Sequence, residues 1–319
     1  MKHPFISWNS LFAKFLSYTC VIILVGCSQG SKKPLETSTS GTIRISVDES
    51  FKPIIDSQIS VFVASHPDAN IIAEYKPEAE CLRDLAKDST RMIIVTRGLS
   101  PEEEIFYKDS LTYVPRFERI AYDAVAVIVN NKSKDSVFTM DDVAEILKGT
   151  SKYKLRPVMD GTSATSTVRF ALDSIINKTN MGKQKMAGFG SGVTAARSSE
   201  AVIDYVSNNE DAIGFIGVSW IGNREDPQQV SFLEKVKIAS VQCVSCSNET
   251  YVKPYQANIA TGRYPMVRSL YYILKENYEG LGSGFANFLI YERGQLIFRR
   301  AYLWPARMKL EVRNAKIDE

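Results

Sequence analysis

The sequence predicts an α/β protein, in which mixed, mostly parallel sheets are covered by helices. Along the chain, short segments that are apolar or that alternate apolar and polar residues are followed by segments in which apolar residues recur every three or four positions. Such an alternation of strands and helices is typical of sheets that are buried on both faces. With 319 residues, 45% of them hydrophobic and 24% charged, the chain has a globular composition. A chain of this length allows about two domains.

The first part of the body begins with a strand and a helix. Residues 43–47 alternate apolar and polar side chains, which predicts a strand, and residues 51–62 carry an apolar helical repeat with Ser50 as its expected N-cap. The segment 100–103 combines a capping box with proline at the first helical position, so a helix is expected to begin there. Further strands are expected at residues 71–73 and 92–95, with a helix at 80–87 between them.

The second part continues the alternation. Residues 119–129 predict a long apolar strand that the pair Asn130-Asn131 closes. Thr139 is expected to cap a short helix that ends at Gly149. The remaining elements are strands at residues 155–159 and 212–216 and helices at 168–176 and from residue 199.

The first 27 residues predict a lipoprotein signal peptide. A basic start leads into the apolar run 15–25, which is too short to span a bilayer. The run ends in the segment 24–27 (LVGC), which resembles the bacterial lipobox, in which the cysteine, here Cys27, becomes the lipid-carrying N-terminus. A flexible tether is expected at residues 28–40. The protein is therefore expected in the bacterial cell envelope, lipid-anchored and facing the periplasm; the alternative is a Sec signal with a fortuitous cysteine.

Several classes of function are excluded. Without the leader, the net charge of +3 falls to about +1, too little for nonspecific nucleic-acid binding. The chain has no P-loop motif, and a Ser-His-Asp triad would have to use His66, beside Pro67 in an expected surface turn. We therefore expect neither an enzyme nor a cofactor.

Three cysteines remain in the expected mature chain. Cys243 and Cys246 form a single C-x-x-C, without the second pair or histidines that a zinc site needs. A local disulfide and two unpaired thiols both fit this spacing. Because the count is odd, one thiol stays unpaired, and Cys81 is the third candidate.

The densest polar signal is the loop 160–167, with five hydroxyl residues in eight positions between a strand and a helix. Hydroxyls at such a place favour anion binding, and Arg169 can add a charged hydrogen bond. Two further strand ends carry similar groups, at Ser50-Phe51 and at Thr96-Arg97. Because ligands bind beyond the carboxyl ends of strands in open α/β sheets, the three loops together predict an anion site. The alternative is a loop that merely caps its own helix.

Five segments of the chain, in order, resemble motifs of the phosphate-binding lipoproteins of ABC importers, within the type-II periplasmic binding proteins. Residues 119–130 (RIAYDAVAVIVN) resemble the family's hinge strand, usually written PVAYDGIAVVVN. The other four segments are residues 138–149, 212–217, 262–268, taken as a return strand, and 288–295, taken as a terminal helix. The resemblance covers roughly residues 41–308, and it rests on the order and spacing of the segments.

This resemblance implies two α/β lobes with a ligand cleft between them. Lobe I is expected from residues 41–120 and 260–319, and lobe II from 121–259. The family binds phosphate without a metal and delivers it to a membrane permease, so we expect these partners and a monomer. The contacts implied for this chain are Ser50, Phe51, Thr96, Arg97, Thr162, Ser163, Thr165, Ser166, Thr167 and Arg169.

Two departures from the family pattern stand out. The hydroxyl-bearing turn after the second strand is replaced by acids, so Glu78 or Glu80 is expected either to accept the proton of hydrogen phosphate or to repel the anion. The second departure is that the family's pocket aspartate aligns near Arg91. Separately, Asp123 is a candidate hinge residue. The alternative function is a two-lobe lipoprotein with a different ligand or a sensory, partner-binding role.

Overall fold

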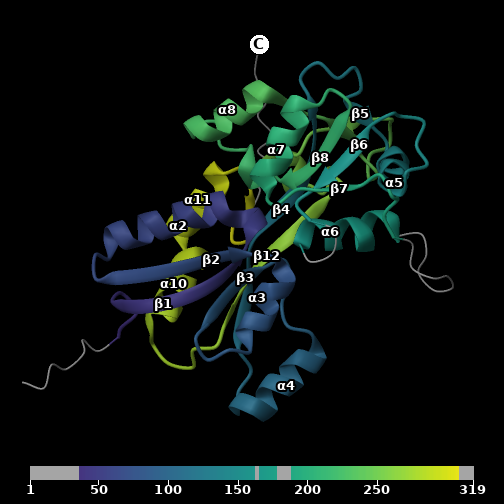
Figure 1. Ribbon diagram of the computed structural model, residues 1–319. Coiled ribbons are helices and arrows are strands. Elements are labelled where there is room, and N and C mark those ends of the chain that lie inside the picture. Colours follow the sequence, from purple (N-terminus) through teal and green to yellow (C-terminus); the bar gives the residue numbers. More distant parts are fainter. Residues whose placement is uncertain (1–35, 162–164, 178–187, 309–319) are drawn as a thin grey trace, which may run out of the picture. The chain divides into compact units, whose positions relative to one another are not determined.

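The computed structural model describes residues 36–161, 165–177 and 188–308 of the chain (Figure 1). The expected signal peptide, the lipidation site Cys27 and most of the expected tether lie outside these residues, as do Thr162 and Ser163. In the described ranges no helix has the length and apolar character needed to cross a membrane.

A mixed sheet of ten strands is the framework of the fold. Its main path runs in the order β2 (Ala69–Lys76), β1 (Gly41–Asp48), β3 (Met92–Val95), β12 (Val267–Leu274), β4 (Arg116–Asn130), β8 (Ala212–Gly217), β6 (Arg156–Met159) and β7 (Thr194–Ala195). Also paired with β4 are β13 (Trp304–Pro305) and β9 (Val236–Ile238). A separate small sheet contains β11 (Tyr251–Val252), β10 (Ser240–Gln242) and β5 (Val137–Phe138). The six strands predicted from the residue patterns are present, whereas the return strand taken at residues 262–268 begins only at Val267 and forms β12.

Strand β4 joins two portions of this sheet. Its residues 116–124 pair with β12, whereas residues 125–129 pair with β8. Parallel pairs lie beyond each partner, β1 with β2 and β3 on one side and β6 with β7 and β8 on the other. We call the portion with β1–β3 the first lobe and the portion with β6–β8 the second lobe. The predicted α/β class and two-lobe fold are confirmed, while the residue bounds of the lobes stay a prediction.

Helices cover both portions (Figure 1). In the first lobe, α3 packs on β1 and β3, and α10 packs on β1 and β12; in the second, α7 packs on β8, β4 and β6. The helices are η1 (Glu49–Phe51), α2 (Lys52–Ser65), α3 (Glu78–Leu85), α4 (Pro101–Leu111), α5 (Met140–Lys148), α6 (Ser166–Phe170), η2 (Ala171–Ile176), α7 (Ser199–Asn208), η3 (Val218–Trp220), α8 (Pro227–Lys235), α9 (Gln256–Ala260), α10 (Leu281–Ile290) and α11 (Glu292–Arg300).

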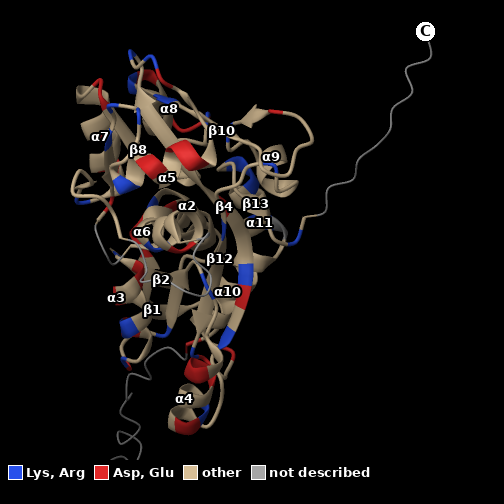
Figure 2. Ribbon diagram, turned by 90° about the vertical axis from the view of Figure 1, so that its right-hand side faces the viewer, with Lys and Arg blue, Asp and Glu red and all other residues tan. Residues whose placement is uncertain are grey.

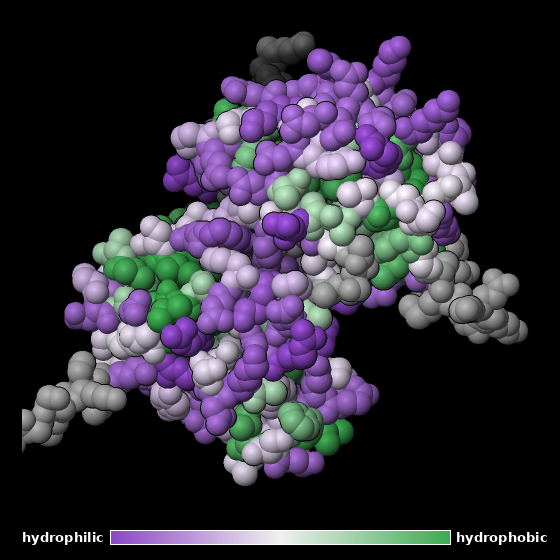
Figure 3. Space-filling model, viewed as in Figure 1, coloured by the Kyte–Doolittle hydropathy of each residue, from purple (hydrophilic) through white to green (hydrophobic). Residues whose placement is uncertain are grey.

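The apolar residues that predicted these elements form the core. Ile43, Ile45 and Val47, on the inward face of β1, are buried, and β4 is buried throughout its second half. Charged residues are spread over helices, strands and loops (Figure 2), and the face seen in Figure 3 is largely hydrophilic. Helix α4 is an exception, because Ile105 and Phe106 are exposed on it.

Three local predictions need correction or refinement. Ser50 does not cap α2: the side chain of Asp48 accepts from the Ser50 backbone N–H at 3.0 Å and caps the short turn η1 instead, which leaves the Ser50 hydroxyl for other partners. The expected helix at 168–176 changes to π geometry from Ala171 onward. The segment 288–295, taken as one terminal helix, spans two helices that meet at Tyr291.

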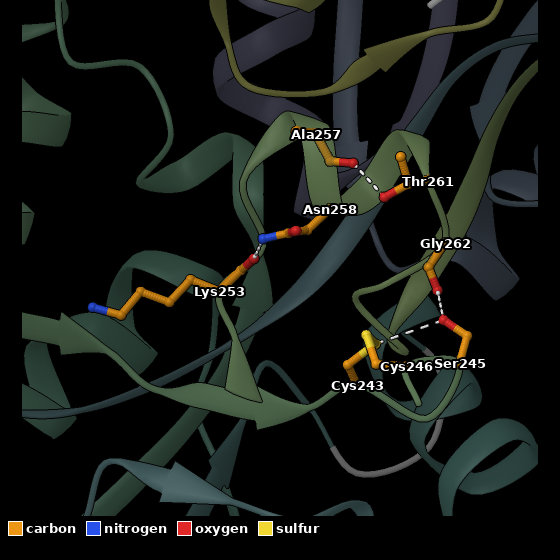
Figure 4. The surroundings of a disulfide bond; sticks show 8 residues. All are labelled: Cys243, Ser245, Cys246, Lys253, Ala257, Asn258, Thr261 and Gly262. Atoms are coloured by element: carbon orange, nitrogen blue, oxygen red, sulfur yellow. Dashed lines mark hydrogen bonds between the residues drawn. A yellow bond between two sulfur atoms is a disulfide. The ribbon is translucent and has the colours of Figure 1, made fainter. Parts of the chain in front are cut away.

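The C-x-x-C forms a local disulfide. Cys243 and Cys246 are joined in a loop beside the turn that precedes β12, where the Ser245 hydroxyl donates to the Gly262 carbonyl at 3.3 Å (Figure 4). Cys81 is a free, buried thiol, and burial raises its pKa. Of the two arrangements that the sequence allowed, the disulfide is the one present.

Removing this disulfide with the double substitution Cys243→Ser and Cys246→Ser is expected to lower the free energy of unfolding by about 2 kcal/mol, the chain-entropy value for so short a loop. Urea denaturation with and without reductant measures the effect. Reductant should shift the wild-type midpoint and leave that of the double variant unchanged. A reductant response in the double variant would assign the effect to another group.

Candidate functional site

Arg268, near the start of β12, is the centre of a buried polar cluster. The register of β12 against β4 places Arg268 opposite Asp123, and Nε of the arginine donates to Asp123 Oδ2 at 2.8 Å. Nη1 donates to the Ser166 hydroxyl at 2.8 Å and to that of Thr167 at 3.3 Å. The guanidinium carbon lies 4.9 Å from the centre of the Phe51 ring. With only 3% of its side chain exposed, Arg268 is a buried cation at the junction of the lobes.

Hydroxyls from both lobes converge beside this guanidinium on Asp160, the residue after β6. Asp160 accepts from the hydroxyls of Ser50 and Thr167 at 3.2 Å each and from that of Thr165 at 2.8 Å. The Ser50 hydroxyl also lies 3.4 Å from that of Ser166 and 3.3 Å from that of Thr167. Ser50 and Asp160 are 110 positions apart in sequence, so folding alone brings the two loops together.

Three buried aspartates, Asp48, Asp123 and Asp160, act through their charge on the buried guanidinium of Arg268. Burial raises the pKa of Asp48 to about 7, with the charge of Glu78 adding to the rise and Arg268 opposing it. Burial likewise raises the pKa of Asp123 and of Asp160. Three atoms of the cluster have no hydrogen-bond partner in the described part of the chain: Asp48 Oδ2, Asp123 Oδ1 and Arg268 Nη2. Buried polar atoms are normally paired, so this set suits a ligand that both accepts and donates hydrogen bonds.

A second polar group lies at the end of β3. Glu78, in the first turn of α3, accepts from Arg169 Nε at 2.7 Å and Nη2 at 3.2 Å, and from the Thr96 backbone N–H at 2.8 Å. The Thr96 hydroxyl contacts both Glu78 and Arg169. Burial alone would raise the pKa of Glu78, but the bonds from Arg169 and Thr96 bring it below its usual value. Glu78 is therefore ionised at neutral pH.

A third contact links η1 to the second lobe. The Glu49 carboxylate accepts from the Ser199 hydroxyl at 2.9 Å and from its backbone N–H, at the start of α7. Burial raises the pKa of Glu49 to about 7, although the bonds from Ser199 oppose the rise. The Ser50 carbonyl accepts from the Ser219 hydroxyl at 3.1 Å and from the Trp220 indole at 3.0 Å. The loop that carries Ser50, which follows β1 of the first lobe, is therefore held against the second lobe.

Most of the predicted site residues meet in these groups. The cluster around Arg268 holds Ser50, Phe51, Thr165, Ser166 and Thr167. The second group holds Thr96, Arg169 and Glu78. The hinge candidate Asp123 is the partner of Arg268.

Three predicted positions lie elsewhere. Arg97 donates from both Nη atoms to Glu103 in the first turn of α4, at 2.6 and 2.8 Å. Glu80 is exposed on α3 and is not the acidic residue that faces the cluster. Arg91 precedes β3, at the opposite end of the strand from Thr96, and its guanidinium pairs with Glu36. Arg91 therefore lies away from the polar group at the end of β3, where Thr96 follows the strand.

Sequence reasoning missed Arg268 as a site residue, together with the buried acids Asp48 and Asp160. A usable signal existed for the arginine, because a charge inside the apolar run 266–274 is costly unless it is paired. Among the described residues, no group of three or more metal-ligating side chains lies close enough together to hold an ion. A cavity of about 600 Å³ lies beside the disulfide loop, and the residues of the polar groups described above do not line it.

Two α/β lobes that share long strands and meet at a buried polar cluster define the chain as a two-lobe binding protein. Residues 33–293 match the PBP superfamily domain, so the chain belongs to that family. No curated protein sequence matches it.

Solved structures of the same fold come from several organisms. A protein from Clostridium perfringens, described as a phosphate ABC transporter substrate-binding protein with bound phosphate, matches with a TM-score of 0.66 at 18% identity over 84% of this chain and 100% of its own. An ABC-type phosphate transport receptor from Vibrio cholerae matches with 0.57 at 17% identity, over 83% and 99%. The Synechocystis CcmR regulatory domain in complex with 2-PG matches with 0.52 at 12% identity, over 78% and 96%. At these identities the likeness shows the fold.

Proposed function

We propose that the chain is the solute-binding protein of an ABC importer, which captures phosphate in the cleft between its lobes and delivers it to a membrane permease. The proposal includes the lipid anchor at Cys27, the envelope location and the monomeric state expected from the sequence. The protein acts by binding: solute-binding proteins of this family are not enzymes.

The observation that carries this proposal is the cluster around Arg268. Its guanidinium offers Nη2 as an unpaired donor, and hydroxyls from both lobes surround it. A phosphate oxygen that accepts from Nη2 would satisfy the donor, and a charge-assisted bond of this kind is stronger than a neutral one. The likeness to two phosphate transport proteins adds support at the level of the fold.

The buried acids supply a basis for specificity. Asp48 Oδ2 is a buried acceptor without a partner, and Asp160 lies in the same cluster. Hydrogen phosphate carries a proton that such a carboxylate can accept, whereas sulfate has none at neutral pH and would meet only repulsion. We therefore expect the site to prefer phosphate over sulfate.

The alternative is a two-lobe protein that binds a different ligand or has a sensory, partner-binding role. It is favoured by the charge balance of the cluster, where Asp48, Asp123 and Asp160 outnumber Arg268. Calorimetric titration of the purified full-length chain, unfolded and refolded to remove bound ligand, separates the two. One-to-one heat with phosphate and none with sulfate supports the importer function, and no heat with either anion supports the alternative.

In the same titration, Ser50→Ala is expected to weaken phosphate binding by roughly tenfold, since a hydrogen bond to a charged group contributes about 1.5–3 kcal/mol. Ser60→Ala, at an exposed serine of α2, is the matched control and should bind as the wild type does. Equal affinity of the Ser50→Ala variant and the wild type would place phosphate outside this cluster.

A further inference from the structure

The carboxylate of Glu78 is held by a set of donors that is suited to an oxyanion. Nε and Nη2 of Arg169 present two parallel N–H groups, the arrangement that binds carboxylate and phosphate in bidentate fashion. The backbone N–H of Thr96 donates to the same carboxylate at 2.8 Å, and the Thr96 hydroxyl also contacts it. The side chain of Glu78 is only 2% exposed, so its two oxygens are surrounded by these groups.

These donors come from both lobes. Thr96 follows β3 and Glu78 begins α3, both in the first lobe, whereas Arg169 belongs to α6, which follows β6 of the second lobe. Arg169 keeps 40% of its side chain exposed, so solvent reaches the guanidinium from one side. A bound anion in a two-lobe protein makes the same kind of bridge, with partners on each lobe.

We infer that Glu78 is a built-in ligand, whose carboxylate occupies an oxyanion site formed by Arg169 and Thr96 and holds the two lobes together there. An inorganic oxyanion can bind to these donors only where the Glu78 carboxylate no longer occupies them. For phosphate, this inference rests on the proposed function, in which the interlobe cleft takes the anion and Glu78, whose charge acts on Asp48, limits the affinity. The vacated site would take phosphate and sulfate alike, since the groups that hold the Glu78 carboxylate are all donors. The neighbouring acid Asp173 lies on the other side of the guanidinium, 3.9 Å from Nη1 of Arg169.

The substitution Glu78→Ser tests the inference. It removes the charge and leaves Arg169 and Thr96 in place. The matched control is Glu80→Ser, which removes an exposed acid two positions away on the same helix. A second variant, Glu78→Gln, keeps an oxygen that can accept from the Thr96 N–H and serves if the serine variant does not fold. Each full-length variant, refolded without ligand, is titrated with inorganic phosphate and, separately, with sulfate.

We expect Glu78→Ser to bind phosphate at least about tenfold more tightly than the wild type, or to bind a second equivalent, because two charge-assisted bonds become available. The same variant should acquire sulfate binding, while Glu80→Ser behaves as the wild type. Glu78→Gln should shift both affinities in the same direction.

The outcomes separate this inference from the proposed function. Phosphate binding by the wild type, with no gain for either anion in the Glu78 variants, overturns the inference and leaves the function intact. Binding of either anion by the variants alone supports the inference and overturns phosphate capture by the native chain. No binding by any form overturns both.

Discussion

Replacement of Arg268 by methionine is expected to lower the free energy of unfolding by about 3–5 kcal/mol, the usual cost of breaking a buried ion pair by removing one partner. The side chain of Arg268 is 3% exposed and that of Asp123 is fully buried, so the carboxylate cannot turn to water when its partner is lost. The Ser166 hydroxyl loses its donor as well. Methionine fills much of the space of the arginine stem, so the loss reports mainly on charge and hydrogen bonds.

Urea denaturation of the wild type and of Arg268→Met measures this loss. Arg263→Met is the control, because Arg263 is an exposed arginine five positions earlier on the same segment. Adding Asp123→Asn to Arg268→Met removes the unpaired charge and should recover part of the stability. A loss below about 1 kcal/mol in the single variant, the size of an exposed ion pair, would contradict the central place given to Arg268.

The fold was predictable because its signals are local. The capping box at Ser100 and Glu103 forms as expected, and so does the cap of α5 at Thr139 with Gly149 in the left-handed conformation. The buried strand β3 has the predicted bounds. Each of these features depends on neighbours within a few positions, which a single sequence displays. The helix cap predicted at Ser50 is wrong for a local reason too, because Asp48, two residues earlier, caps the short turn η1 instead.

The site was predictable only in part, because its partners are distant in sequence. The hydroxyls of Ser50, Ser166 and Thr167 could be expected from their place at strand ends. Which arginine joins the cluster could not be predicted. Arg97 stands at a strand end but pairs with Glu103. Arg268 reaches the cluster through the register of β12 on β4, although it is 145 positions from its partner Asp123. Register between distant strands follows from packing of the whole sheet, which no local pattern records.

The stability of the protein is expected to fall as the pH rises from 5 to 7, by up to about 2 kcal/mol for each of Asp48 and Glu49. Burial raises the pKa of both carboxyls to about 7, from ordinary values of 3.8 and 4.5. The raised pKa of Asp123 and Asp160 adds to the trend.

The sign follows from proton binding. A carboxyl with a raised pKa holds its proton in the folded chain at a pH where the unfolded chain has lost it, so its stabilising effect is complete below about pH 4 and disappears as the pH passes 7. Carboxyls with lowered pKa, such as Glu78 and Asp142, act in the opposite sense and at lower pH, between their folded and unfolded values. Between pH 5 and 7 the buried acids of the cluster therefore dominate.

Unfolding by urea at half-unit steps from pH 5 to 7.5 measures the slope, and the variants Asp48→Asn and Glu49→Gln assign it. The amide oxygen introduced by Asp48→Asn would still accept from the Ser50 N–H, and that introduced by Glu49→Gln would still accept from Ser199. Each variant therefore keeps the hydrogen bond and loses the titration. Each should flatten the curve, whereas Glu80→Gln, at an exposed carboxylate, should not. An unchanged slope in both Asp48→Asn and Glu49→Gln would mean that these acids are already ionised at pH 5 and would contradict their raised pKa.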